Sequence, residues 1–513
     1  MSENWQIGKA ETRSTHGLVA CQHWLAAEAG AGVLAAGGNA VDAAVTTALV
    51  LSVVEPWLSG VGGGGFLLRA DGASGDVDVL DFNVVSPAAL DPADYPLIGR
   101  DDGDWFNWPA VEADRNLIGY GSICTPGTVA GLSAALSRFG TISWEQALAP
   151  AIEQAHRGLL VDWYAALALA IDGHNLSKFP SSSALFLREG RAPRVPEGGG
   201  TLFLPMSAKA ATLERLAKAG ARDFYEGEIA DRLVSGLRQR GSRLSGRDLQ
   251  AYQPRWLPSQ TQAYRDRLVH AVPGLSGGPT LLSVLADLET SLTSKDPLGG
   301  ETALAFARAL RRANEQRYRS LGHAAGQSCT SHISVVDADG TMVSLTNTLL
   351  SRFGSKVVVP DLGFALNNGV MWFDPRPGRP NSIAPGARPL ANMSPVIVAR
   401  DGRPELALGA AGGRQIVPAV AQILAYVLAF DMPLEAAFSV PRIDASGAGI
   451  RINRSASAQV TASIASEFDV EILEDTLYPV SFAVPSAVMR RQGANIGMAH
   501  PRNPWAAVRE GRR

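Results

Sequence analysis

Cysteine is scarce in this chain. Its 513 residues include three cysteines, Cys21, Cys124 and Cys329, which lie far apart and form no CxxC pair. An odd number of widely spaced cysteines fits neither a disulfide framework nor a zinc site. Long apolar runs are also missing, since no uncharged stretch approaches the 20 residues that span a membrane. We therefore expect no metal centre and no membrane partner.

An excess of positive charge is likewise absent. The chain has 46 Lys and Arg residues against 49 Asp and Glu, a formal charge of −3, so nucleic acid is not the expected partner. Its first 17 residues, MSENWQIGKAETRSTHG, are polar and lack the apolar core of a secretory signal. With 46% hydrophobic residues it can bury a sizeable core. We expect a cytoplasmic globular protein that acts on a small molecule or another protein.

Two packed helices are expected near the start, over residues 23–38 and 40–56. Asn39 stands at an N-cap position, and Asp42 follows three residues later. The glycines of SGVGGGGFLL match G-x-G-x-x-G, but the expected helix precedes them and a strand follows, the reverse of a dinucleotide-binding turn. This pattern favours a tight helix-to-strand turn.

The texture of the sequence changes within residues 321–329. Residues 140–320 are typical of a helix-rich region, whereas β-branched runs follow, at residues 355–362, 392–399 and 403–413 among others. Just after the change, residues 331–336 and 341–348 alternate around the turn Asp-Ala-Asp-Gly, which indicates a β-hairpin. A four-residue loop would place Thr330 opposite Asn347, and a two-residue turn would place it opposite Leu349. In either register Thr348 lies within one residue of Thr330.

A threonine hydroxyl becomes a useful nucleophile when a base removes its proton. One known base is the residue's own α-amine, released when the preceding peptide bond is cut. This chemistry needs a small nucleophile at the head of a strand, after a loop that can be cleaved. Thr330, after AAGQSC, meets both requirements. From the hairpin alone, an ordinary Thr-rich pair at a sheet edge is the simpler interpretation.

Six motifs strengthen the first interpretation. They are GGNAVDAAV (37–45), GGGGF (62–66), TPGTVAG (125–131), TSHISVVDADG (330–340), RPLANMSP (388–395) and GAAGG (409–413). With them the chain resembles the γ-glutamyltransferase family of N-terminal-nucleophile (Ntn) hydrolases over most of its length. The resemblance implies an α/β fold, an αββα four-layer sandwich built by two subunits of one self-cleaved precursor.

The resemblance also assigns roles. It implies a zymogen that cuts itself between Cys329 and Thr330, giving a large subunit of residues 1–329 and a small one of residues 330–513. Thr330 would be the nucleophile and Thr348 its hydrogen-bond partner, while the backbone N–H groups of Gly412 and Gly413 would form the oxyanion hole. Adjacent glycines suit that role because no side chain blocks the approach. No metal or organic cofactor is expected, and a homodimer of such heterodimers is left open.

The residues that hold a γ-glutamyl group in the family are replaced here. Asn83 stands where the family has an arginine, Ala391-Asn392 replace a serine pair, Leu350 replaces an asparagine, and Trp372-Phe373 stand where an aspartate is expected. Losing one charge-assisted contact costs on the order of 1.5–3 kcal/mol. These substitutions predict a pocket for a flatter or more apolar acyl group.

Arg352 and Lys356 follow the second threonine closely. They are interpreted either as a relocated positive charge for the substrate or, more simply, as residues of a solvated loop.

The expected reaction is cleavage of a small-molecule amide through an acyl-Thr330 intermediate that passes to water or to an amine. The first alternative is a true γ-glutamyltransferase or glutathione hydrolase, active in glutathione metabolism. The second is an unprocessed, non-catalytic scaffold or binding protein. A thiol enzyme using Cys329 is a further alternative, but the sequence offers that thiol no identified base.

Overall fold

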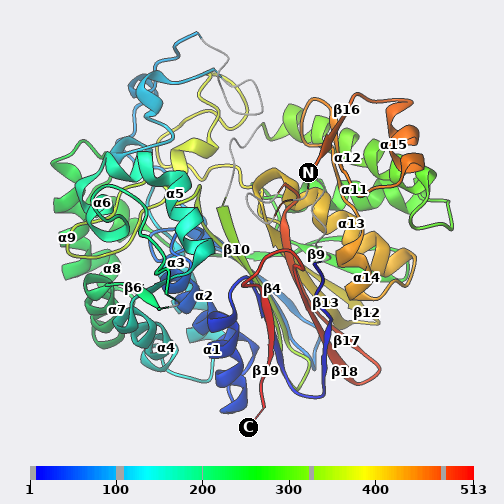
Figure 1. The fold of residues 1–513 in the computed structure, drawn as a ribbon, viewed down its shortest axis with the longest axis horizontal. Helices are drawn as coiled ribbons and strands as arrows, with labels where there is room; N and C mark the ends of the chain where they lie inside the picture. Colours follow the sequence, from blue (N-terminus) through cyan, green and yellow to red (C-terminus); the bar gives the residue numbers. More distant parts are fainter. Residues whose placement is uncertain are drawn as a thin grey trace.

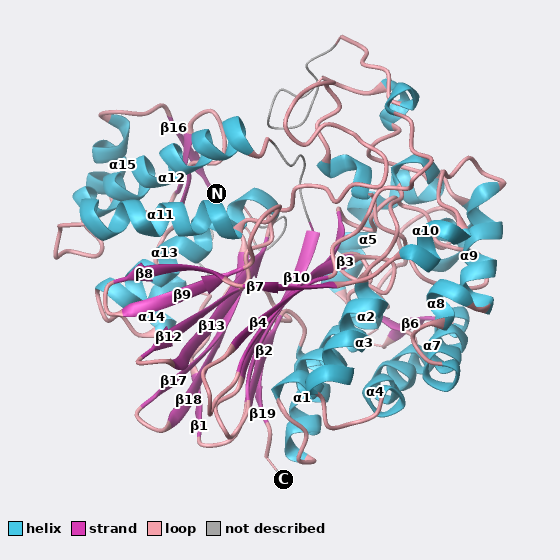
Figure 2. Ribbon diagram, turned by 180° about the vertical axis from the view of Figure 1, so that it is seen from behind, coloured by secondary structure: helices cyan, strands magenta, loops and turns pink. Residues whose placement is uncertain are grey.

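Two seven-stranded antiparallel sheets lie face to face at the centre of the molecule, with helices on both outer faces (Figures 1 and 2). The computed structural model describes residues 7–99, 109–198, 200–322, 329–474, 476 and 481–512. This arrangement confirms the expected αββα sandwich. The change of texture expected within residues 321–329 falls largely on residues 323–328, which lie outside the described residues.

The first sheet has the strand order β19-β2-β10-β11-β3-β4-β7. Its strands are β2 (Leu18–Cys21), β3 (Gly64–Ala70), β4 (Val77–Asp81), β7 (Arg255–Pro258), β10 (Cys329–Val336), β11 (Met342–Leu350) and β19 (Ala507–Glu510). The hairpin β10–β11 therefore lies in the middle of the sheet, which excludes the simpler interpretation as an edge pair.

The second sheet has the order β1-β18-β17-β13-β12-β9-β8. Its strands are β1 (Thr12–Ser14), β8 (Gln260–Tyr264), β9 (Arg267–Ala271), β12 (Val396–Arg400), β13 (Arg403–Ala411), β17 (Val484–Arg491) and β18 (Ala494–Ala499). Smaller sheets pair β5 (Leu159–Val161) with β6 (Leu202–Leu204), and β14 (Ile443–Asp444) with β15 (Ile450–Asn453) and β16 (Val470–Leu473). Strands β7 to β9 interrupt the region that the sequence indicated as helix-rich.

Helices of the large N-terminal part cover the first sheet. They are α1 (Trp24–Ala35), α2 (Ala40–Val54), α3 (Thr128–Phe139), α4 (Trp144–Arg157), α5 (Trp163–Ser177), α6 (Pro180–Phe186), α7 (Ser207–Ala219), α8 (Asp223–Glu226), α9 (Glu228–Arg238) and α10 (Gly246–Ala251). The second sheet is covered by α11 (Gly278–Ser291), α12 (Gly300–Ser320), α13 (Ile416–Ala429), α14 (Leu434–Ser439) and α15 (Ala458–Ala465).

The cap predicted for the second helix is confirmed. The Asn39 side chain accepts hydrogen bonds from the backbone of Val41 and Asp42, and the Asp42 carboxylate accepts one from the Asn39 backbone. This capping box fixes the start of α2, all of whose residues are buried. Helix α2 then packs against β10 and β11, so it forms the floor beneath the hairpin.

The run at residues 355–362 does not form the expected strand. It turns back at once, with the Val359 N–H donating to Phe364 O and a single bridge between Val358 and Ala365. Its valines pack into the core on the helix side of the first sheet. The β-branched residues of this segment reflect its burial in the core and not pairing with a neighbouring strand.

Within the described residues, no helix combines the length and the apolar character needed to cross a bilayer.

Candidate active site

Thr330 lies at the head of β10 and faces the gap between the two sheets. Thr330 pairs directly with Thr348 of β11, so both registers predicted from the sequence were wrong by one residue. The Thr330 hydroxyl donates to the Thr348 hydroxyl at 3.4 Å, and both side chains are fully buried. The predicted approach of the two hydroxyls is therefore confirmed.

The Thr348 hydroxyl also donates to the backbone carbonyl of Cys329. That carbonyl belongs to the peptide bond between Cys329 and Thr330. In addition, the Thr348 oxygen accepts from the Leu350 N–H at 2.8 Å. One hydroxyl thus contacts the candidate nucleophile and the oxygen of the carbonyl group whose carbon the nucleophile would attack, while a backbone N–H fixes its orientation.

A β-bulge explains the register. Cys329 pairs with Leu350 and Thr330 with Thr348, so Leu349 is an extra residue on β11. Leu350, beside the bulge, has a φ of 81°, which is unfavourable for a residue with a Cβ, and it is completely buried. The backbone is therefore strained directly opposite the candidate cleavage site, a placement typical of functional sites.

The hydroxyl-rich face of the hairpin continues below Thr330. His332 contacts the Thr346 hydroxyl at 2.9 Å through Nδ1 and the Ser334 hydroxyl at 3.0 Å through Nε2. Burial lowers the pKa of His332 to about 3, so its imidazole is neutral. The Ser334 hydroxyl in turn donates to Ser486 O in the other sheet. These polar side chains are satisfied inside the sandwich and tie the two sheets together.

A buried acid, Glu55, lies against the opposite face of β10. The Ser331 hydroxyl donates to Glu55 Oε2 at 3.5 Å, just beyond the end of α2. Burial raises the pKa of Glu55 well above its ordinary value, which favours the neutral form of the carboxyl group. Beside it, Asn347 accepts from the Thr128 hydroxyl at 2.9 Å. Nothing in the sequence distinguishes Glu55, which follows a helix as many surface glutamates do.

Gly412 and Gly413 follow β13 at the same end of the sandwich as Thr330. An added Cβ on Gly409 would lie 2.3 Å from the His332 ring, so β13 crosses β10 there. Ser344, further from Thr330, donates to Leu408 O. The chain of β13 therefore runs towards the Thr330 end as it approaches the glycine pair. Gly412 has a φ of 136° and Gly413 one of 60°, which favour glycine at both positions.

The predicted substrate residues are brought into one region. Leu350, Trp372, Phe373 and Ala391 belong to the same apolar cluster between the sheets, and each is buried. Asn83 is buried too, and its amide donates to Pro389 O at 3.3 Å, just before Ala391. Four separate segments of the sequence therefore meet at one packed apolar cluster.

Asn392 is a second polar member of this set. Its Oδ1 accepts from Arg317 at 3.2 Å, whereas its amide nitrogen is buried without a hydrogen-bond partner among the described residues. Arg317 also donates to Ala391 O at 2.8 Å. Asn392, Arg317 and Arg414, the residue after the glycine pair, line a small polar pocket. Burial lowers the pKa of Arg317 to about 10, which leaves it cationic at neutral pH.

Arg317 and Arg414 were not identified from the sequence. Arg317 is one of several arginines in the helix α12, and nothing in their spacing distinguishes it.

The two cations after β11 do not form a solvated loop. Arg352 and Lys356 both pair with Asp172 of α5, at 2.5 and 3.2 Å. Lys356 is buried, and burial lowers its pKa. The pair therefore anchors α5 beside the hairpin. Asp172 pairs with the two cations that the sequence analysis had considered as a substrate-binding positive charge.

Cys329 is a poor nucleophile in this setting. Burial, the largest influence, raises the pKa of its thiol to about 12. Among the residues that the structure describes, no group of three His, Cys, Asp or Glu side chains is arranged to hold a metal ion.

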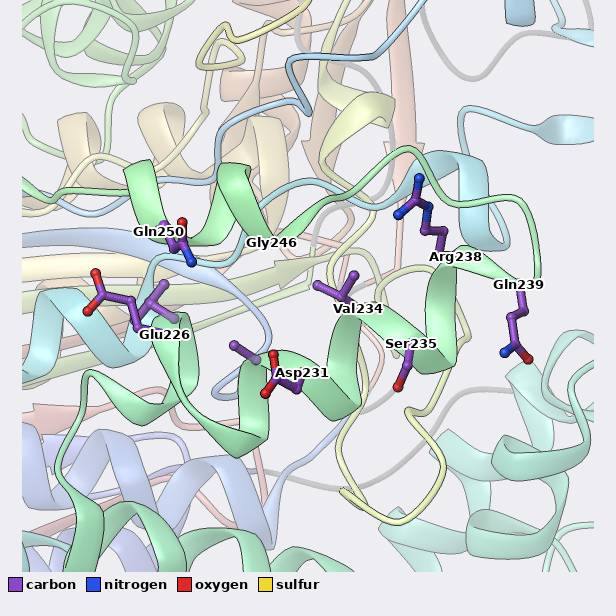
Figure 3. A pocket seen from close by; sticks show the side chains of 10 residues that line it. Glu226, Asp231, Val234, Ser235, Arg238, Gln239, Gly246 and Gln250 are labelled. Atoms are coloured by element: carbon purple, nitrogen blue, oxygen red, sulfur yellow. The ribbon is translucent and has the colours of Figure 1, made fainter.

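A larger pocket lies elsewhere, on the surface formed by α8, α9 and α10 (Figure 3). Asp231, Ser235 and Arg238 of α9 and Gln250 of α10 line it. None of the predicted catalytic residues contributes to this lining, so we do not assign it to the active site.

The sandwich with a buried threonine at the head of a central strand has the fold of the Ntn hydrolases. In agreement, the chain superposes on a cephalosporin acylase from Bacillus halodurans with a TM-score of 0.83, at 24% identity over 99% of this chain and 98% of that one. The sequence model described as "Gamma-glutamyltranspeptidase" matches residues 26–329 and 323–509. The chain belongs to the gamma-glutamyltranspeptidase family.

Relatives within the family carry names that state different activities. A glutathione hydrolase proenzyme of Bacillus subtilis is 31% identical, with 83% of this chain and 80% of the relative covered. An acylase ACY 1 proenzyme of a Pseudomonas species is 29% identical, with 89% and 87% covered. Both names describe a proenzyme, so processing of a precursor is a property of these relatives.

Proposed function

We propose that this chain is a self-processing threonine amidohydrolase of the family, with a pocket that no longer selects a γ-glutamyl group. The observation that carries the proposal is the Thr348 hydroxyl, which contacts both the Thr330 hydroxyl and the Cys329 carbonyl. A nucleophile, a carbonyl and a donor to that carbonyl are thereby assembled in the uncut chain.

In the processing step, Thr330 Oγ1 attacks the carbonyl carbon of Cys329. A C–O ester bond forms, the C–N bond breaks, and the hydroxyl proton ends on the α-amine of Thr330. Water then hydrolyses the ester, which frees the Cys329 carboxylate and restores the Thr330 hydroxyl. The donor at Thr348 stabilises the negative charge that develops on the carbonyl oxygen.

In the mature reaction, the freed amine takes the proton of Thr330 Oγ1 as the hydroxyl attacks an amide substrate. The N–H groups of Gly412 and Gly413 would stabilise the oxyanion, and water or an amine would resolve the acyl-enzyme. Thr330 is fully buried in the uncut chain. A substrate therefore reaches it only after cleavage lets the chain before Thr330 move away, which makes the uncut chain a zymogen.

The apolar surroundings favour an acyl group without a zwitterionic end. Burying an unpaired charge against Leu350, Trp372 and Phe373 is costly, and the acylase relative is consistent with other acyl groups in this family.

A glutathione hydrolase is the second candidate, because Arg317 and Asn392 place a cation and an amide donor near the glycine pair. These groups would replace the lost family contacts to a carboxylate.

Processing is tested by intact-mass analysis and N-terminal sequencing of purified protein. We expect subunits of residues 1–329 and 330–513, the smaller beginning Thr-Ser-His-Ile. Thr330→Ala should leave one chain of 54.0 kDa. A single intact wild-type chain would support the non-catalytic alternative, and a small chain with another first residue would exclude Thr330 as the nucleophile.

Specificity is tested with the processed enzyme and matched anilides. We expect kcat/KM to be higher for small apolar or aromatic acyl anilides than for the γ-glutamyl anilide. A value for glutathione near or above about 10⁴ M⁻¹s⁻¹ would contradict the altered pocket and favour the second candidate. The cytoplasmic location and a dimer of heterodimers stay predictions.

A further inference from the structure

A second polar pocket lies where the segment after α14, the end of β15 and the end of β18 meet. Its cavity volume is about 70 Å³. Arg442, Asn453, Ser455, His500 and Arg502 contribute polar groups to its lining. No aspartate or glutamate belongs to the described part of that lining, so its charged side chains there, Arg442 and Arg502, are cations.

His500 is the unusual member. Its side chain is 2% exposed, and neither ring nitrogen has a hydrogen-bond partner among the described residues. Burial, together with the positive charges of Arg442, Lys9 and Arg502, holds the pKa of His500 well below its ordinary value. A buried polar group without a partner costs about 1–3 kcal/mol, so native proteins rarely keep one without a reason.

We propose that this pocket is a binding site for a small oxyanion, with His500 as a central ligand. An oxyanion would accept a hydrogen bond from the N–H of His500. It would also place negative charge among the cations that otherwise repel a proton on His500. Phosphate and a short carboxylate share this chemistry, and the experiment below separates them.

Arg442 connects the pocket to the candidate oxyanion hole. It donates to Phe482 O at 3.0 Å and to Ala483 O at 3.3 Å. An added Cβ on Gly412 would lie 2.7 Å from the Ala483 Cα, so Ala483 forms the wall behind Gly412. An anion that fixes Arg442 would also hold this wall. This second part of the inference rests on the proposed function.

Binding is tested by equilibrium dialysis of the full chain with inorganic phosphate and, separately, acetate, at constant ionic strength set with sodium chloride. We expect one site per chain, and the anion that binds more tightly identifies the ligand class. His500→Asp places a carboxylate in the pocket, so it should weaken binding at least about tenfold and raise the Tm without added anion. His174→Asp, the same change on the exposed surface of α5, should bind as the wild type does.

Should His500→Asp fail to fold, His500→Asn keeps the pocket neutral and should also weaken binding. The absence of saturable binding of either anion to the wild type would overturn the proposal, as would unchanged binding by both His500 variants. Dialysis needs no turnover, so a failure of the threonine chemistry would leave this test intact. Saturation of the site without a change in kcat would refute the link to Gly412.

Discussion

Replacing Thr348 by valine tests the central contact of the site. Valine has nearly the shape of threonine, so the change removes one hydroxyl and little volume. Three hydrogen bonds are lost with it: the donor to Cys329 O, the acceptor for the Thr330 hydroxyl, and the acceptor for the Leu350 N–H. The first two bear on chemistry and the third on stability.

The size of each effect follows from these contacts. Loss of one donor to a developing oxyanion lowers a rate by about 10²–10³, so the uncut chain should persist at least about 100 times longer. The Leu350 N–H would be buried without an acceptor, which costs about 1–3 kcal/mol of stability. A protein of this size is expected to stay folded after such a loss, so slower cleavage can be distinguished from unfolding.

The assay follows the disappearance of the uncut chain by denaturing gel and intact mass after rapid purification. Thr346→Val is the matched control, because it removes a buried hydroxyl from the same face of β11 where it contacts His332 and not the cleavage site. We expect near-normal cleavage in that variant, and recovery of cleavage in Thr348→Ser. Cleavage of folded Thr348→Val at the wild-type rate would show that Thr348 does not assist the reaction.

Three further predictions concern groups around the hairpin. Because burial raises the pKa of Glu55 in the folded chain, stability falls as pH rises above the ordinary value of 4.5 until the folded pKa is reached, by up to about 1.4 kcal/mol per pH unit. Glu55→Gln should remove this slope in urea midpoints measured from pH 5 to 8, and parallel slopes would contradict the raised pKa of Glu55. Asp172→Asn should destabilise the chain by about 3 kcal/mol, because Lys356 and Arg352 lose their shared buried partner. The control Asp231→Asn, on the surface of α9, should change the urea midpoint little, and equal effects of the two substitutions would argue against a structural ion cluster. Cys329→Ala should be cleaved at a near-normal rate in the gel assay, since only the backbone carbonyl of Cys329 takes part, and its failure to cleave while folded would revive the thiol alternative.

The helices α1 and α2 and the hairpin could be predicted because local rules decide them. Asn39 and Asp42 form a cap through neighbouring atoms alone, and the alternation of residues 331–336 sets which face each side chain occupies. The register could not be predicted in the same way. It depends on the bulge at Leu349, whose N–H donates to Leu58 O outside the hairpin. A contact from another segment therefore decides which residue of β11 pairs with Thr330.

The substrate region shows the same limit more strongly. Comparison of motifs pointed to Leu350, Trp372 and Ala391, and the fold does gather them in one cluster. The charged group near them, Arg317, comes from a helix that carries no recognisable pattern, and only the packing of α12 brings it close. Arg317 then holds Asn392 Oδ1, which leaves the amide nitrogen as the group presented to the small pocket. The predicted loss of family contacts could be proposed from single residues of the sequence, whereas the proposed replacement depends on how helix α12 packs against the loop before β12.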